Sequence, residues 1–213
     1  MIFYCFLAIT ADAVVALAEK IGGTEENFVK MMNDKAQELG LKNTNFKNCH
    51  GLDEDDHYSS ANDMAMIARE LVKHQKILDY SSIYETYLRK GTDKQIWLVN
   101  TNKLVRFKQG VDGLKTGYTE GSGYCLTATM KQDNMRIIAV AMGEPDSGTR
   151  NDEVSGMLDY AFAQYAMDTI YTKDSVIDTL KLDKSNMDTV DIIPTEDITV
   201  SYTHLTLPTK LEV

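Results

Sequence analysis

The stretch Asp112–Met130, DGLKTGYTEGSGYCLTATM, holds the most informative residues of this sequence. A turn-forming Asp-Gly pair stands before Lys115-Thr116-Gly117, and a glycine-rich turn separates this triplet from an apolar run. The order predicts that the triplet lies on a β-strand at the rim of a cleft. An ammonium and a hydroxyl there suit a carboxylate, and glycine lets a ligand backbone approach the strand. A lone triplet of this kind is weak evidence, so the flanking segments must support it.

The segments that follow predict a hairpin and a covering helix. Two apolar runs, Gly123–Lys131 and Met135–Gly143, are separated by a short polar turn and therefore predict antiparallel strands. Apolar residues then recur at helical spacing from Val154 to Tyr165, which predicts a helix packed on the sheet. An earlier run, Ile96–Val99, predicts a further strand, and Trp97 within it is expected in the core or a cleft wall.

The segments that precede the triplet are predominantly helical. Apolar spacing predicts a first helix over Asp12–Ile21 and a second that begins after a Thr24 cap and ends near Leu39. A polar loop spans Asn43–Tyr58, and a third helix follows from Ser60 to about His74.

Beyond residue 167 the sequence changes to short alternating segments, at Val176–Leu182, Thr189–Ile193 and Asp197–Val200. These segments predict the beginning of a small all-β unit. We therefore expect four parts: an atypical segment (1–11), a partial catalytic domain (12–167), the start of a C-terminal β domain (168–201) and an unrelated tail (202–213).

Composition excludes several classes of protein. With 22 Lys and Arg against 32 Asp and Glu, the net charge is -10 and the pI about 4.8, which disfavours nucleic acid as a partner. The longest apolar run, Met1–Ile9, falls short of the roughly 20 residues of a membrane span and lacks the features of a signal peptide. Three widely spaced cysteines indicate neither a disulfide framework nor a metal site, although Cys49, His50 and His57 lie close in sequence. We expect no metal and no cofactor.

Several motifs in order make the chain similar to a known family. Together with the triplet, the segments GLDEDDHYSSANDMAMIA, AVAMG and PDSGTR resemble the serine-type D-alanyl-D-alanine carboxypeptidases, low-molecular-mass penicillin-binding proteins of peptidase family S11. The resemblance covers about residues 12 to 200. It implies an α/β (α+β) fold, with an antiparallel sheet flanked by helices, incomplete at the N-terminus and followed by the start of a small β domain.

The resemblance also implies roles for individual residues. In the family a serine of an S-x-x-K motif attacks the penultimate D-alanine carbonyl, its lysine acts as base, an S-x-N motif assists proton movement and K-T-G binds substrate. Here the K-T-G residues are Lys115, Thr116 and Gly117, and the Tyr118 backbone N–H would complete an oxyanion hole. Arg150 would bind the terminal carboxylate; the alternative is a surface arginine paired with Asp152 or Glu153.

Two family motifs have no counterpart in the sequence. No serine is followed by lysine three positions on, and Ile9-Thr10-Ala11 stands where the S-x-N motif is expected. We therefore expect an N-terminally truncated chain with a foreign start, without nucleophile and base. Ser60-Ala61-Asn62 matches S-x-N as a string but is interpreted as a helix cap, and His50 and His57 as loop residues rather than general bases.

The expected function is removal of the terminal D-alanine from peptidoglycan stem peptides by an acyl-enzyme route, outside the cytoplasmic membrane. Intact members of the family bind β-lactams, and membrane association would come only through parts missing here. The present chain is expected to be inactive alone. The alternative is a non-catalytic module that binds peptidoglycan or β-lactams; a class A β-lactamase is disfavoured by the β-rich segment after residue 167.

Overall fold

The computed structural model describes residues 11–181 and 188–203. The chain divides into two compact units, Met1–Asp159 and Tyr160–Val213. This division falls earlier than the expected boundary between residues 167 and 168. The expected atypical start and most of the expected tail lie outside the described residues, so those two predictions stay predictions.

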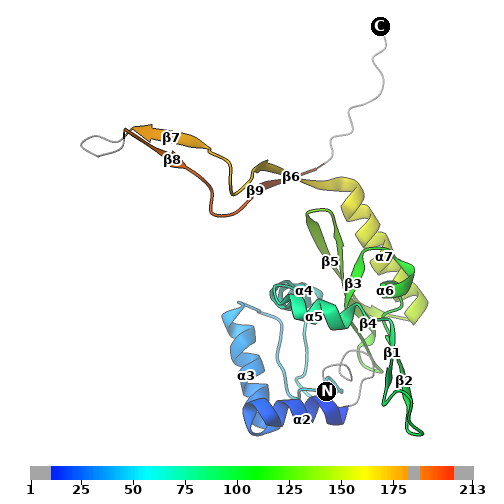
Figure 1. Cartoon of the computed structure of the whole chain (residues 1–213). Helices are drawn as coiled ribbons and strands as arrows, with labels where there is room; N and C mark the ends of the chain where they lie inside the picture. Colours follow the sequence, from blue (N-terminus) through cyan, green and yellow to red (C-terminus); the bar gives the residue numbers. More distant parts are fainter. Residues whose placement is uncertain (1–10, 182–187, 204–213) are drawn as a thin grey trace. The chain divides into compact units, whose positions relative to one another are not determined.

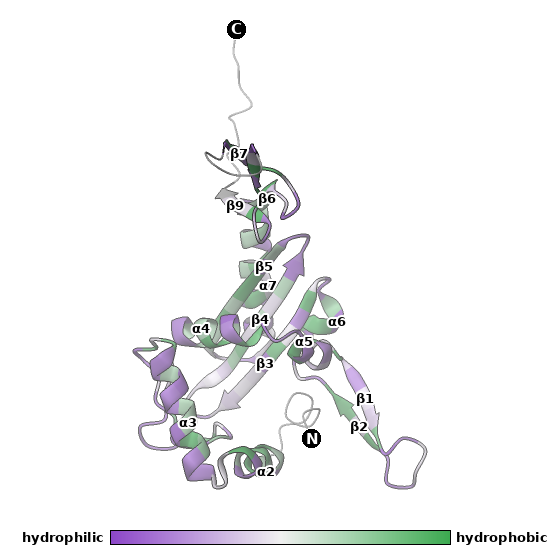
Figure 2. Ribbon diagram, turned by 60° about the vertical axis from the view of Figure 1, so that its left-hand side comes forward, coloured by the Kyte–Doolittle hydropathy of each residue, from purple (hydrophilic) through white to green (hydrophobic). Residues whose placement is uncertain are grey.

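A three-stranded antiparallel sheet forms the centre of the first unit (Figures 1 and 2). Its strands are β3 (Val111–Thr119), β4 (Gly123–Gln132) and β5 (Met135–Glu144), in the order β3-β4-β5. Gln132 pairs with Met135, so a two-residue turn joins β4 to β5, and Asp133 adopts a positive φ of 51° there. The predicted hairpin is confirmed, and β3 is left as an edge strand.

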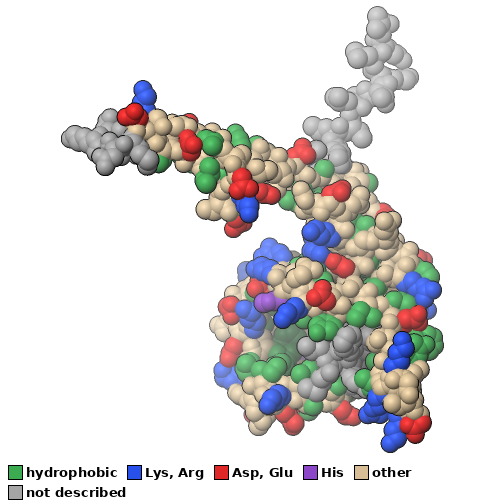
Figure 3. All heavy atoms as spheres, viewed as in Figure 1, with side chains coloured by type: hydrophobic (Ala, Val, Ile, Leu, Met, Phe, Trp, Pro, Cys, Tyr) green, Lys and Arg blue, Asp and Glu red, His purple; other side chains and the backbone are tan. Residues whose placement is uncertain are grey.

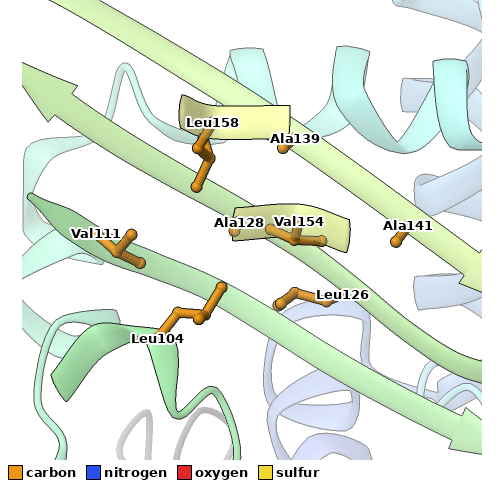
Figure 4. Close-up of a cluster of buried hydrophobic side chains, with 8 residues drawn as sticks. All are labelled: Leu104, Val111, Leu126, Ala128, Ala139, Ala141, Val154 and Leu158. Carbon is orange, nitrogen blue, oxygen red and sulfur yellow. The ribbon is translucent and has the colours of Figure 1, made fainter. Parts of the chain in front are cut away.

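Helix α7 (Ser147–Gln164) covers one face of this sheet. Val154 and Leu158 of α7 are fully buried against small and branched side chains of the strands, as Figure 4 shows. Alanines at 128, 139 and 141 let the helix approach the sheet closely, and Leu104 of the short helix α6 (Leu104–Phe107) completes the cluster. The predicted helix on the sheet is confirmed, but it ends at Gln164, because Tyr165 begins a strand.

Two helices lie on the opposite face of the sheet (Figures 1 and 2). They are α4 (Ala61–Leu71) and α5 (Gln75–Ser81), which contact β5 and β3 respectively. Ala68, Leu78 and Leu114 form the buried centre of this second cluster. The resulting helix, sheet and helix layers confirm the expected α/β class.

The first described elements are α2 (Ala11–Gly22) and α3 (Glu25–Glu38), which pack against each other. The Asn27 N–H donates to Thr24 Oγ1 at 3.1 Å, so the predicted cap is present. Gly22 is required by packing, because a Cβ there would lie 2.8 Å from the Phe28 nitrogen.

Strand β2 (Ile96–Val99) is present as predicted and pairs with β1 (Glu85–Leu88), a strand that periodicity did not reveal. These two strands form a sheet of their own, separate from β3-β4-β5. The expectation for Trp97 is wrong: its side chain is 58% exposed, and its indole N–H donates to Glu85. A two-stranded sheet has no second layer to bury the ring.

The described residues of the second unit that follow the end of α7 form two β-ribbons. Strand β6 (Tyr165–Tyr171) pairs with β9 (Ile198–Thr203), and β7 (Asp178–Lys181) pairs with β8 (Thr189–Ile192). Strand β9 includes residues 202 and 203, which the sequence assigned to the tail, because they pair with β6. Hydrophobic side chains such as Ile170, Leu180 and Ile193 are exposed on this unit (Figure 3), since two strands alone enclose no core.

Candidate functional site

The Lys-Thr-Gly triplet lies in the middle of edge strand β3, beside a pocket of about 230 Å³. The pocket is bounded by α4 and the three strands of the central sheet. Lys115, Thr116 and Gly117 line it together with Cys125 of β4 and Leu71 of α4. The structure therefore places the triplet where the sequence predicted it, on a strand beside a cleft.

Lys115 is a half-buried cation in this pocket. Its Nζ donates to the Thr116 carbonyl oxygen at 2.6 Å. Burial, and secondarily the charge of Arg150, lower the pKa of Lys115 to about 8. In the part of the chain that the structure describes, no carboxylate forms an ion pair with this ammonium.

Arg150 lies in the first turn of α7 and is only 5% exposed. Its Nε and Nη2 both donate to Asn151 Oδ1, at 3.2 and 2.9 Å. Within residues 11–181 and 188–203 it has no ion pair with Asp152 or Glu153, so the alternative of a surface ion pair is wrong. Burial lowers the pKa of Arg150, and its charge contributes to the lowered pKa of Lys115, although Arg150 itself does not line the pocket.

The PDSGTR segment positions Arg150 by capping α7. The Asp146 carboxylate accepts hydrogen bonds from the backbone N–H groups of Gly148 and Thr149 and from the Thr149 hydroxyl. These hydrogen bonds hold the pKa of Asp146 below its usual value. The negative cap stabilises the helix N-terminus and orients the turn that holds Arg150.

Thr116 is buried, at 6% exposure, and is paired with Leu126 of the neighbouring strand β4. Its hydroxyl oxygen lies 2.5 Å from the hydroxyl oxygen of Thr101, and either group can be the donor. The sequence did not indicate a role for Thr101. This residue lies shortly after β2 and is fifteen positions before Thr116 in the sequence.

Gly117 and Tyr118 continue the strand. Among the described residues, a Cβ on Gly117 would meet nothing closer than the Cys125 Cβ at 3.9 Å, so packing against them does not demand glycine at this position. The open space fits a ligand backbone that approaches the strand. The Tyr118 ring is 55% exposed and packs against Tyr124, with 4.3 Å between ring centroids. The role of the Tyr118 N–H as an oxyanion donor stays a prediction.

Buried amides that the sequence analysis did not single out fix the start of β3. Asn102 donates from Nδ2 to the Gly113 carbonyl at 3.1 Å, and Asn100 donates to the carbonyls of Ser81 and Ile83 at 3.0 Å. The Ser81 hydroxyl donates to the Asp112 carbonyl at 2.6 Å. In the sequence these two residues appear only as an Asn-x-Asn string, and no hydrophobic periodicity indicates that their side chains are buried.

The histidine, cysteine and serine candidates at His57, Cys49 and Ser60 form hydrogen bonds within or beside the loop between α3 and α4. The Asp63 N–H donates to Ser60 Oγ at 3.2 Å, so the cap interpretation of Ser60 is confirmed. His57 accepts a hydrogen bond from the Lys47 N–H, and burial lowers its pKa. Cys49 donates to Glu25, and burial raises the pKa of its thiol to about 11.

The polar loop also touches the β3–β4 turn, since the Gly121 N–H donates to Asp53 Oδ2 at 3.3 Å. Among the described residues no group of three or more His, Cys, Asp or Glu side chains could hold a metal ion. Likewise, none of the helices in the described ranges is long and apolar enough to cross a membrane.

Comparisons with known proteins match both the sequence and this geometry. The family model Peptidase_S11, described as D-alanyl-D-alanine carboxypeptidase, matches residues 2–146. The D-alanyl-D-alanine carboxypeptidase DacF of Bacillus subtilis is 51% identical over 189 residues, which cover 89% of this chain and 49% of that protein. DacC of Escherichia coli is 35% identical over 180 residues, 83% of this chain and 44% of that protein.

Solved structures agree with these relatives. Penicillin-binding protein 5 of Haemophilus influenzae has a TM-score of 0.79 at 33% identity, covering 95% of this chain and 58% of the other. PBP3 of Streptococcus pneumoniae, a peptidoglycan synthesis regulatory factor, has a TM-score of 0.80 at 26% identity, with coverage of 95% and 62%. The fold is thus that of the penicillin-binding proteins.

The chain belongs to the D-alanyl-D-alanine carboxypeptidase family, peptidase S11, as the sequence motifs predicted. It spans about half the length of the curated relatives that it matches.

Proposed function

We propose that this chain is the substrate-binding part of a serine-type D-alanyl-D-alanine carboxypeptidase, which removes the terminal D-alanine of peptidoglycan stem peptides. One observation carries the proposal: Lys115 and Arg150 are both withdrawn from solvent without a carboxylate partner in the described residues. Two interacting cations that are both withdrawn from solvent are costly unless an anion joins them. The free carboxylate of a peptide is an anion of the right size and charge.

Residues of β3 and Arg150 of α7 have separate roles in the proposed binding of the peptide. Lys115 and Arg150 attract the terminal carboxylate, and the hydroxyl of Thr116 donates a hydrogen bond to it. The peptide backbone lies along β3, whose outer edge is unpaired in the described sheet, in the manner of an added strand. Gly117 leaves room for that approach, and the Tyr118 N–H stabilises the oxyanion of acyl transfer.

The family relationship extends the proposal to partners and location. The relatives are named D-alanyl-D-alanine carboxypeptidases and penicillin-binding proteins, so β-lactams are expected as ligands of the intact protein. A peptidoglycan substrate places the activity outside the cytoplasmic membrane, at the cell envelope.

Calorimetric titration of the chain with diacetyl-L-lysyl-D-alanyl-D-alanine tests the proposal. The Lys115→Ala variant should lose about tenfold or more in affinity, because a hydrogen-bonded charge to the carboxylate is removed. Lys131→Ala is the matched control, since this exposed lysine lies on neighbouring strand β4 and outside the pocket. Equal binding by the two variants would refute the assignment of Lys115.

A further inference from the structure

The contact between the hydroxyls of Thr101 and Thr116 joins an exposed residue to a buried one. Thr101 belongs to the segment after β2 and is open to solvent, whereas Thr116 is almost completely buried on β3. Their oxygens are 2.5 Å apart, which is a short hydroxyl hydrogen bond. Thr101 itself does not line the pocket, so its influence on a ligand must pass through Thr116.

The residues on both sides of Thr101 hold it in place. Asn100 and Asn102 are buried, and each donates side-chain hydrogen bonds to backbone carbonyls, including that of Gly113 on β3. The Asn102 N–H also donates to Asn100 Oδ1 at 2.9 Å. Thr101 is therefore fixed relative to β3 by the hydrogen bonds of its two neighbours, in addition to the contact of its own hydroxyl.

The direction of this hydrogen bond decides what Thr116 can offer a ligand. A hydroxyl has one proton, so a Thr116 that donates to Thr101 has none left for a carboxylate. If Thr101 donates instead, the Thr116 proton is free to point into the pocket. An anion held by Lys115 favours this second arrangement, because it is an acceptor only, and each hydrogen bond in the chain then polarises the next.

We propose that Thr101 is a positioning residue, which donates its proton to Thr116 and so directs the Thr116 hydroxyl toward the carboxylate of the bound peptide. This inference rests on the proposed function of the site. It adds a residue to the carboxylate-binding machinery that neither the triplet nor Arg150 includes.

The test compares two ligands that differ only at the C-terminus: diacetyl-L-lysyl-D-alanyl-D-alanine and its C-terminal amide. The Thr101→Val variant removes the hydroxyl at nearly constant shape and should bind the acid about fivefold less tightly, with little change for the amide. Thr101→Ser keeps the hydroxyl and should restore the affinity for the acid. A merely structural role of Thr101 would instead weaken both ligands alike.

A double-mutant cycle completes the experiment. In a Thr116→Val background, Thr101→Val should have no further effect, because the hydroxyl on which it acts is gone. Equal acid affinities of the wild-type chain and Thr101→Val, or a full additional loss in the Thr116→Val background, would overturn the inference alone. If the wild-type chain binds neither ligand, the proposed function of the site fails and this inference fails with it.

Discussion

Lys115, the cation proposed to bind the carboxylate, lies in an unfavourable environment. Its folded-state pKa of about 8 lies below the ordinary lysine value of 10.5, because burial and the charge of Arg150 disfavour the ammonium. An anionic ligand would supply the missing countercharge and raise this pKa again. The charged form of Lys115 is therefore unfavourable in the free chain, and we expect a bound carboxylate to stabilise it.

The pH dependence of binding follows from this pKa. As the pH rises through about 8, Lys115 loses its proton and the affinity for the D-alanyl-D-alanine peptide should fall, whereas a Lys115→Arg variant should bind with a flat profile. Calorimetric titrations on both sides of that pH measure the change. A wild-type profile as flat as that of the variant would contradict the assignment.

Folding stability should respond in the opposite direction. Between the folded pKa of about 8 and the unfolded value, the unfolded chain binds more protons at Lys115, so the contribution of this group to stability rises with pH in that window. Urea denaturation of the wild-type chain and Lys115→Met across that range separates this contribution from those of other groups. A wild-type stability that declines there relative to Lys115→Met would show that Lys115 is not desolvated.

Gly113 illustrates how close packing sets a residue type on β3. A Cβ at this position would lie 2.6 Å from the Ser81 hydroxyl oxygen and 3.1 Å from the Ser81 Cβ. Gly113→Ala should therefore destabilise the chain by about 1–3 kcal/mol, as overpacking does, measured by urea denaturation. Adding Ser81→Gly removes the clash and should recover part of the loss; no recovery would mean that the clash is not the cause.

At the scale of elements, helix α7 links the core to the site. Its first turn holds Arg150, and its middle buries Val154 and Leu158 against the sheet (Figure 4). The position of the arginine thus depends on hydrophobic packing one to two turns away. A loosened helix would move the cation away from β3.

Leu158→Ala should cost about 2–5 kcal/mol of folding stability, because a fully buried side chain is removed and the surrounding alanines cannot fill the space. Met157→Ala is the matched control, since this neighbour on α7 is 39% exposed and should cost much less. Thermal or urea denaturation of both variants gives the comparison. Similar losses for the two would mean that α7 does not pack as described.

At the scale of the whole molecule, the strand with the Lys-Thr-Gly triplet is present but the nucleophile motif is not. The printed sequence contains no S-x-x-K string, and Ser60, which matches S-x-N as a string, caps α4 instead. Nucleophile and base act as a unit with the oxyanion hole, so we predict that the remaining groups bind substrate without forming an acyl-enzyme.

A fluorescent penicillin should accordingly leave no covalent label on the purified chain. The measurement is a denaturing gel after incubation, with an intact S11 carboxypeptidase as positive control. A labelled band from this chain would show that another of its residues acts as nucleophile.

The local pattern was sufficient for the elements with strong periodicity or distinct turn chemistry. The β4–β5 hairpin, the capped helices and the strand holding Lys115 follow from spacings within about twenty residues. The sequence analysis did not predict strand β1 or the short helices α5 and α6, since they have only a few residues and no periodicity. Strand β6 was not predicted because Tyr165 continues the apolar spacing of α7. The strand that pairs with it, β9, lies far along the chain.

By itself, the sequence determined the family, the layered fold and the place of Lys115-Thr116-Gly117 on a strand beside a pocket, because these depend on motifs and on local hydrophobic patterns. Only the tertiary structure decided that Arg150 is buried and that its charge affects the pKa of Lys115, and that the hydroxyl of Thr101 contacts that of Thr116. The physical reason is that burial and hydrogen bonding arise from segments brought together by folding, and no local pattern records which distant side chain will supply the partner.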